Sequence, residues 1–372
     1  MIEDYKMDEK ISIILPIFNV GVHLKGGIDS LINQTIGSDN LEIIMVDDCS
    51  TDESGKIIDE YAEKYECCRA IHLEKNTGAA NGPRNRGLEV ATGDFIMFLD
   101  PDDRYTPDAC ETLYNALTEN DVDVAFGRFR RVFTQQNKTQ KSYSPYLDNL
   151  EEIYNENFEI SNPLNVSDAL WESIFKRIVY GKDIEVKYDR SKPVDTIKVD
   201  SIEEEPDLLK IPPSVWCKIY KRELIEKNNL RFPPYVCGDD MAFTLESLLN
   251  ANGIVFLNNF IAYDYYIRDL PEDSSITNTV NVRFLRDLMD AYTYCSKCTK
   301  NYSNNIQNIS VNPHLLYWIN TWRTSPFTKE ENRLLLNRVN TLKKVHKTDL
   351  KTKLLLSSMS TAIETSIYTS RE

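Results

Sequence analysis

The sequence has little histidine and none of the glycine-rich motifs that mark several large enzyme classes. Only four of its 372 residues are histidine, and no two are close along the chain, so metal or triad chemistry built on histidine is not expected. No G-x-G-x-x-G follows the first predicted strand, which argues against a dinucleotide-binding protein. The sequence also lacks G-x-x-x-x-G-K-[ST], which argues against a P-loop nucleotidase. The G-x-S-x-G turn of the serine hydrolases is missing too.

The chain also lacks long apolar runs and an excess of basic charge. No stretch approaches the roughly 18 apolar residues of a membrane-spanning helix, and the charged residues 1–10 contain no apolar segment typical of a signal peptide. The 43 basic and 58 acidic residues give a net charge of −15, which argues against a nucleic-acid-binding protein. Eight cysteines are scattered along the chain with one CxxC pair, Cys295 and Cys298, which favours reduced, structural thiols over a zinc site.

Strand-like and helix-like segments alternate over residues 11 to about 130. This alternation predicts an α/β fold with a doubly wound, mostly parallel sheet flanked by helices. The predicted strands are 11–18, 41–46, 70–73, 95–99 and 122–126. The predicted helices are 22–36, 52–65, 83–90 and 107–117, and after residue 214 we expect a helix at 241–250 and strands at 254–257 and 261–267.

Composition divides the chain into a main domain and a helical C-terminal region. We expect residues 1–270 to form the main domain and 271–372 to be mainly helical. Residues from about 134 to 210 are polar and acid-rich, and they are read as an insertion that borders the functional site or as a solvated linker.

Acidic residues follow the ends of the predicted strands. The apolar run 95–99 stops at Asp100, and Pro101 cannot continue a strand, so Asp100, Asp102 and Asp103 are presented at its carboxyl end. Open α/β sheets bind ligands at that edge. Neighbouring carboxylates repel each other, so they favour a hard metal ion held against substrate phosphates. The alternative is a solvated acidic turn.

An ordered set of motifs across roughly residues 10–270 resembles family-two inverting glycosyltransferases with the GT-A fold. The matching segments are Ile14-Leu15-Pro16-Ile17-Phe18-Asn19, Val46-Asp47-Asp48-Cys49-Ser50-Thr51-Asp52, Asn76-Thr77-Gly78, Pro83-Arg84-Asn85, Asp100-Pro101-Asp102-Asp103 and Gly238-Asp239-Asp240. The third and fourth segments are most similar to those of poly(ribitol phosphate) wall teichoic acid N-acetylglucosaminyltransferases. The insertion at 134–210 departs from that pattern, as does Asp239, where the usual motif has Glu.

The resemblance implies a UDP-sugar donor held at the strand ends. Phe18 would lie against the uracil ring in a pocket shaped by Pro16, and Asp48 would accept the uracil N3 hydrogen. Asp102 would ligate Mn²⁺ or Mg²⁺ at the diphosphate, with Asp103 as a further acid behind it. The complete implied donor site is Pro16, Phe18, Asp48, Asn76, Arg84, Asp100 and Arg268, of which Arg84 suits phosphate because its planar fork donates in pairs.

The resemblance also implies that Asp240 is the general base for an acceptor hydroxyl and that Asp239 holds it or touches the donor sugar. The implied reaction transfers N-acetylglucosamine or a hexose to a cell-envelope polysaccharide, a polyol phosphate or a lipid-linked glycan. A metal-dependent nucleotidyltransferase and a non-catalytic UDP-sugar-binding scaffold are the alternatives. Packing is the alternative for Pro16 and Phe18, for Trp216 and for the tyrosines at 263, 265 and 266. Helix capping is expected of Asp52.

The C-terminal region contains a basic amphipathic segment. Nine Lys or Arg and three acids lie between Arg323 and Lys353, and apolar residues recur at helical intervals. Such a segment binds anionic membranes, or it packs against its own domain or a sister subunit in a homo-oligomer. We therefore expect a cytoplasmic protein, either free or peripheral on the inner face of the cell membrane.

Overall fold

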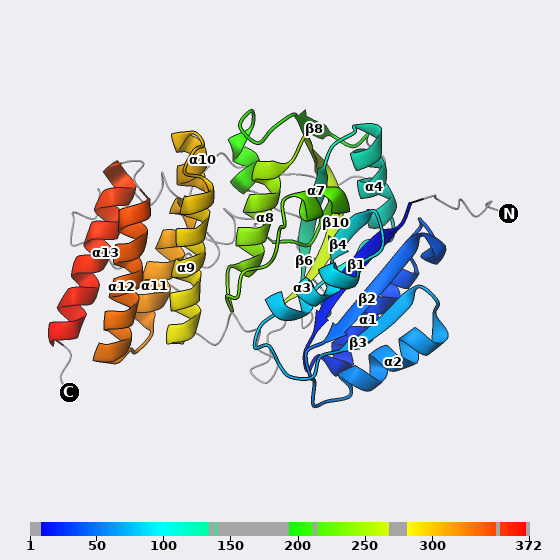
Figure 1. Ribbon diagram of the computed structural model, residues 1–372, viewed down its shortest axis with the longest axis horizontal. Coiled ribbons are helices and arrows are strands. Elements are labelled where there is room, and N and C mark those ends of the chain that lie inside the picture. Colours follow the sequence, from blue (N-terminus) through cyan, green and yellow to red (C-terminus); the bar gives the residue numbers. More distant parts are fainter. Residues whose placement is uncertain are drawn as a thin grey trace.

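The computed structural model describes residues 9–133, 138–139, 193–210, 214–267, 281–346 and 350–369. Within these residues one sheet of ten strands organises the chain, in the order β3-β2-β1-β4-β9-β6-β10-β5, with β7 paired to β6 and β8 to β10 (Figure 1). The predicted α/β class with a mostly parallel sheet is confirmed, and so is the helical C-terminal region.

The first half of the sheet is parallel, and its central strands are buried. Its strands are β1 (Ile11–Ile17), β2 (Leu41–Asp47), β3 (Cys68–His72) and β4 (Phe95–Phe98). Its connecting helices are α1 (Gly21–Ile32), η1 (Ser38–Asn40), α2 (Ser54–Lys64) and α3 (Asn81–Val90). Every residue of β1 and β4 is buried because helices cover both faces, which explains why these strands are continuous apolar runs.

An antiparallel strand interrupts the second half of the sheet. β9 (Lys218–Lys221) runs antiparallel between β4 and β6 (Val124–Phe133), and β6 pairs in parallel with β10 (Ile254–Ile267). The two strands predicted at 254–257 and 261–267 are this single strand, because register shifts between Phe256 and Tyr263 let the pairing with β6 continue. The other described elements before residue 281 are β5 (Arg104–Tyr105), α4 (Ala109–Glu119), β7 (Lys138–Thr139), β8 (Thr196–Val199), η2 (Pro206–Lys210), α7 (Arg222–Lys227) and α8 (Asp239–Asn250).

Several helix boundaries differ from the predictions. Helix α3 begins at Asn81 instead of Pro83, and α8 begins at Asp239 instead of Met241. Both differences move polar residues into a first helical turn, where backbone N–H groups are still unpaired. The insertion predicted at about 134–210 lies mostly outside the described residues, and its described end forms β8 and η2. The proposed boundary near residue 270 stays a prediction.

Helices of the C-terminal region pack beside α8 and away from the parallel strands (Figure 1). They are α9 (Val282–Cys298), α10 (Asn304–Ile309), α11 (Asn312–Thr324), α12 (Lys329–Val345) and α13 (Leu350–Thr369). The apolar residues Leu335, Val339 and Leu342 of α12 are fully buried in a core shared with α9 and α13. Of the alternatives for the basic segment, its apolar face therefore packs on its own domain. No helix within the described residues is long and apolar enough to cross a membrane.

Candidate active site

Three tight turns form the edge of the sheet where the candidate residues lie. Asn19 follows β1 with φ 51°, Cys49 follows β2 with φ 64°, and Cys217 precedes β9 with φ 54°. Left-handed backbone at a residue other than glycine costs about 1–3 kcal/mol and persists where surrounding contacts hold it. Phe18, beside the first of these turns, is 46% exposed although it follows a buried strand, whereas Pro16 is buried within β1. The burial of Pro16 is in line with the packing alternative, and its role in a uracil pocket stays a prediction. Phe18 presents an aromatic face at the strand end.

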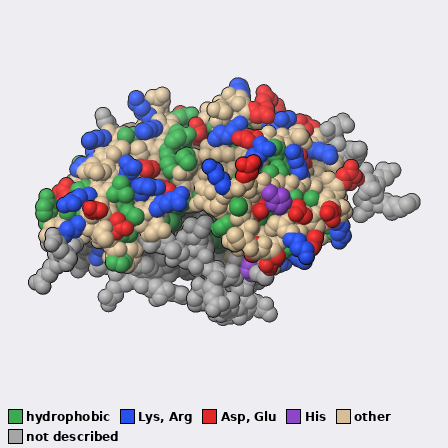
Figure 2. Space-filling view, turned by 60° about the horizontal axis from the view of Figure 1, so that its bottom comes forward, with side chains coloured by type: hydrophobic (Ala, Val, Ile, Leu, Met, Phe, Trp, Pro, Cys, Tyr) green, Lys and Arg blue, Asp and Glu red, His purple; other side chains and the backbone are tan. Residues whose placement is uncertain are grey.

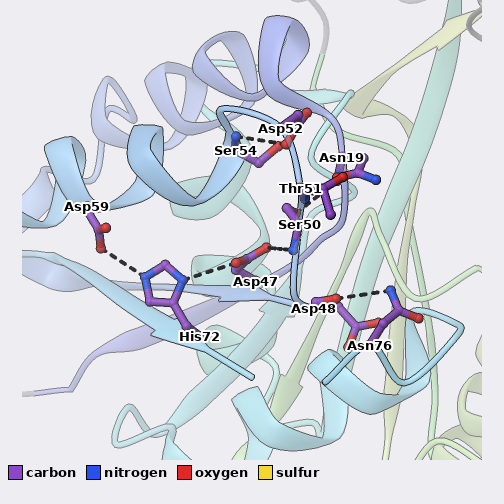
Figure 3. Close-up of polar contacts among 10 residues, drawn as sticks. All are labelled: Asn19, Asp47, Asp48, Ser50, Thr51, Asp52, Ser54, Asp59, His72 and Asn76. Atoms are coloured by element: carbon purple, nitrogen blue, oxygen red, sulfur yellow. Dashed lines mark hydrogen bonds and ion pairs between the residues drawn. The ribbon is translucent and has the colours of Figure 1, made fainter. Parts of the chain in front are cut away.

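The loop after β3 closes on Asp48. Its buried carboxylate accepts hydrogen bonds from the Thr77 backbone N–H (2.8 Å) and the Thr77 hydroxyl (2.9 Å). The Asn76 side chain donates to the Asp48 carbonyl oxygen at 3.1 Å (Figure 3). Burial raises the pKa of Asp48, and the nearby charge of Asp47 adds to this effect. The structure thus brings together Asp48 and Asn76, and it adds Thr77, which sequence reasoning passed over although it stands inside the Asn-Thr-Gly segment.

A second polar network fixes the turn after β2. Asp47 accepts from the Ser50 backbone N–H at 3.0 Å and faces His72 of β3, which in turn faces Asp59 of α2 (Figure 3). Asp52 accepts from the N–H groups of Ser54 and Gly21, so it joins the starts of α2 and α1. Asp52 thus accepts hydrogen bonds from the first turns of both helices and connects them, instead of capping α2 alone.

Arg84 connects two acidic segments that are far apart in the sequence. It lies in the first turn of α3, is 5% exposed, and donates to Asp100 at 2.8 Å and to Asp239 at 3.1 Å. Its guanidinium also lies over the Phe232 ring. A charged group this deeply buried requires such partners, because leaving one carboxylate unpaired would cost several kcal/mol. The structure therefore places Arg84 as a bridge between the end of β4 and the start of α8.

Asp239 and Asp240 occupy the first turn of α8. Gly238 precedes them with φ +85°, and a Cβ there would lie 2.8 Å from the Ala291 Cβ of α9, so only glycine fits this turn. Burial and the charge of Asp239 raise the pKa of Asp240 to about 7. A carboxyl group with a pKa near the working pH is suited to act as a general base.

Asp102 and Asp103 differ sharply in their surroundings. Asp103 is 1% exposed and accepts from the Tyr263 hydroxyl (3.0 Å) and the Tyr266 backbone N–H (2.8 Å), so it ties the end of β4 to β10. Burial raises the pKa of Asp103 well above its usual range. Asp102 is half-buried on the same turn. Within the described ranges, no three His, Cys, Asp or Glu side chains converge on one metal position.

Lys218 is a buried charge that sequence reasoning missed. It is 1% exposed, donates from Nζ to the Ser214 carbonyl oxygen at 2.7 Å, and lies over the Phe126 ring. Burial lowers the pKa of Lys218. Trp216, two residues earlier, stacks on Tyr263 at 4.7 Å between ring centroids, in line with the packing alternative. The predicted Arg268 lies outside the described residues.

Comparison with known proteins gives a consistent picture. Residues 12–178 match the family Glycosyl transferase family 2. The uncharacterized glycosyltransferase YibD of Escherichia coli K12 is 28% identical over 80% of this chain and 73% of its own length. Poly(ribitol-phosphate) beta-N-acetylglucosaminyltransferase TarP of Staphylococcus aureus is 28% identical over 70% of this chain and 62% of its own length. The poly(ribitol-phosphate) beta-glucosyltransferase of Bacillus spizizenii is 28% identical over 69% of this chain, which spans only 32% of that relative.

A solved structure resembles the fold over nearly the whole chain. Residues 1–349 of S. aureus TarS in complex with UDP-GlcNAc superpose with a TM-score of 0.67, covering 96% of this chain and 91% of that one at 19% identity. At this identity the likeness establishes the fold, including the helical C-terminal region.

Proposed function

We propose that this chain, whose residues 12–178 match Glycosyl transferase family 2, transfers a sugar from a UDP-sugar to a hydroxyl of a cell-envelope polysaccharide or lipid-linked glycan, with inversion at the anomeric carbon. The observation that carries the proposal is the buried Arg84 bridge from Asp100 to Asp239. It joins the strand end expected to hold the donor to the helix turn that carries the expected base.

The donor side of the site suits a uridine nucleotide. An exposed aromatic face at Phe18 can stack on a base, and the carboxylate of Asp48 can accept the N3 hydrogen that uracil has and cytosine lacks. Related proteins are named for transfer of N-acetylglucosamine and glucose, which supports N-acetylglucosamine or a hexose as the donor sugar.

Asp240 supplies the proton chemistry in the proposed reaction. Its carboxylate takes the proton of the acceptor hydroxyl as that oxygen bonds to the anomeric carbon, and the bond to the UDP oxygen breaks on the opposite face with its electrons leaving on UDP. General base catalysis of this kind contributes about 10²–10⁴-fold. Asp239, held by Arg84, fixes the turn from which Asp240 acts.

The acids after β4 fit a divalent metal ion, Mn²⁺ or Mg²⁺. Such an ion is commonly held by one or two carboxylates together with substrate phosphates, so a site does not require a cluster of three protein ligands. Asp102, half-buried at the strand end, would be the principal ligand. When bound, the ion offsets the charge that develops on the departing diphosphate.

The basic charge of the C-terminal region bears on the place where the protein acts. Its described residues, 281–346 and 350–369, carry twelve Lys or Arg and five Asp or Glu, a net of +7 in a chain of net −15, and Figure 2 shows basic side chains over that end of the molecule. We propose contact with phosphate-bearing surfaces at the inner face of the membrane. Since the apolar face of α12 is buried, this contact would be electrostatic and would weaken in high salt.

A transfer assay tests the proposal. The protein is incubated with UDP-GlcNAc or UDP-glucose, Mn²⁺ and a poly(ribitol phosphate) or lipid-linked acceptor, and both UDP release and the anomeric configuration of the product are measured. Product of inverted configuration, formed by the wild type and lost in Asp240→Asn, supports the proposal. Retained configuration, or full transfer by both Asp102→Ala and Asp240→Asn, contradicts it.

A further inference from the structure

His72 lies between two carboxylates, one facing each nitrogen of its ring. Nδ1 is 3.1 Å from Oδ2 of Asp47, and Nε2 is 3.0 Å from Oδ1 of Asp59 (Figure 3). A neutral imidazole has one N–H and can donate to only one of them, whereas the imidazolium donates to both. The geometry therefore favours the charged ring. The hydrogen bond to Asp59, followed by that to Asp47 and opposed by burial, raises the pKa of His72.

Hydrogen bonds link Asp47, and through it His72, to the two turns of the expected uridine site. Its Oδ1 accepts from the Ser50 backbone N–H, and the Ser50 hydroxyl accepts from the Asn19 backbone N–H at 3.0 Å. The Asn19 side-chain oxygen accepts from the Thr51 N–H at 2.8 Å. One continuous network thus runs from His72 to the turn next to Asp48 and to the turn next to Phe18. Both turns contain a residue with left-handed backbone, so they depend on contacts of this kind.

We propose that His72 is a positioning residue for the donor: as an imidazolium it fixes Asp47, and through Asp47 the turns that carry Phe18 and Asp48, so that UDP-sugar affinity falls when His72 loses its proton. This inference rests on the proposed function, because it concerns the same nucleotide site. No step of the reaction uses His72, so its effect is on binding of the donor and not on the chemical step.

The surroundings of His72 allow it to titrate. Its side chain is 45% exposed, so protons exchange freely with solvent. The charged groups that act on the ring are Asp47 from β2 and Asp59 from α2. Gly55 of α2 lies beside both groups: a Cβ there would be 3.4 Å from the Asp47 carboxylate and 3.6 Å from the His72 ring. Asp59 touches the ring on the side away from the turns, so it can be changed without altering the contacts of Asp47 with Ser50.

Titration calorimetry with UDP-GlcNAc from about pH 5.5 to about 8.5 tests the inference, because His is the side chain whose charge ordinarily changes in this range. The diphosphate of this probe keeps its charge over that range. The wild type should bind about five- to tenfold more weakly at the high-pH end, which corresponds to roughly 1 kcal/mol for loss of a partly exposed ion pair. His72→Gln should bind weakly at both ends, without the high-pH decline.

Asp59→Asn is the second variant. It removes one carboxylate partner, so the high-pH decline should move to lower pH while the affinity at the low-pH end is kept. Glu60→Gln is its matched control: Glu60 lies on the same helix, is paired with Lys56, and should leave the profile unchanged. Thermal unfolding of each variant shows whether it is folded.

The outcomes separate the inference from the proposed function. If the wild type binds UDP-GlcNAc with the same affinity across the range, or if His72→Gln keeps the wild-type profile, the inference is overturned and the proposed function stands. If no protein binds UDP-GlcNAc at any pH, the proposed donor is wrong. A kcat reduced with an unchanged KM in His72→Gln would also contradict a role in donor positioning.

Discussion

Replacing Asp240 with Asn should separate its cost to stability from its role in the reaction. In the folded protein, burial and the charge of Asp239 raise the pKa of Asp240 from 3.8 to about 7. A pKa difference of one between the folded and unfolded states corresponds to about 1.36 kcal/mol, so the ionised carboxylate destabilises the folded state by about 4 kcal/mol at most. Asn has nearly the same shape and carries no charge, so it removes this cost.

The sign of the effect follows from the two pKa values. Between about pH 4 and pH 7 the unfolded chain has already lost the Asp240 proton, while the folded protein still holds it. The folded state binds more protons, so stability falls as pH rises through this window and is level above it. Between about pH 5 and pH 8 the wild type should therefore lose about 3 kcal/mol relative to Asp240→Asn.

Urea unfolding of both proteins at the two pH values measures this difference. The free energy of unfolding of Asp240→Asn should not show the fall between these two pH values that the Asp240 carboxyl causes in the wild type. In the transfer assay its kcat should fall about 10²–10⁴-fold while its affinity for UDP-GlcNAc is unchanged. Equal pH dependence of stability in the two proteins would refute the effect ascribed to burial, and undiminished kcat would refute the assignment of the base.

Three further predictions concern the frame of the site. Asp102→Ala should abolish the Mn²⁺-dependent part of UDP binding, and calorimetry with and without Mn²⁺ checks this. Arg84→Met should lower the free energy of unfolding by about 3–5 kcal/mol because it leaves Asp239 buried without its partner; a loss under about 1 kcal/mol in urea unfolding would contradict the bridge. Gly238→Ala should cost about 1–3 kcal/mol, since its Cβ would lie 2.8 Å from that of Ala291 and its φ is +85°; an unchanged unfolding midpoint would show that the turn adapts.

The strand ends could be predicted because the underlying patterns are local. Runs of apolar residues mark β1, β2 and β4, and the polar residues that terminate them lie at one edge by the rules of parallel sheets. These patterns predict the positions of Asp48 and Asp100, whereas the role of Phe18 in the site is implied only by the family resemblance. The antiparallel direction of β9 was not predictable, because a four-residue strand carries no local sign of its direction.

The contacts that link distant segments could not be read from the sequence. Arg84 and Asp239 are 155 positions apart, and no pattern in either segment points to the other. His72 was set aside because histidines are few and isolated in the chain, yet the pairing of β2 with β3 places it opposite Asp47. The roles of the individual site residues stay predictions that the experiments above address.

A thermal-shift panel of UDP, GDP, CDP and NAD, each with and without Mn²⁺, tests the central claim most directly. A ligand that binds only the folded protein at about 100 times its Kd adds roughly 2.7 kcal/mol of stability. We predict stabilisation by UDP alone among these ligands, increased by Mn²⁺, with the increase lost in Asp102→Ala. Stabilisation by another nucleotide and not by UDP would contradict the assignment of this chain as a UDP-sugar-dependent glycosyltransferase.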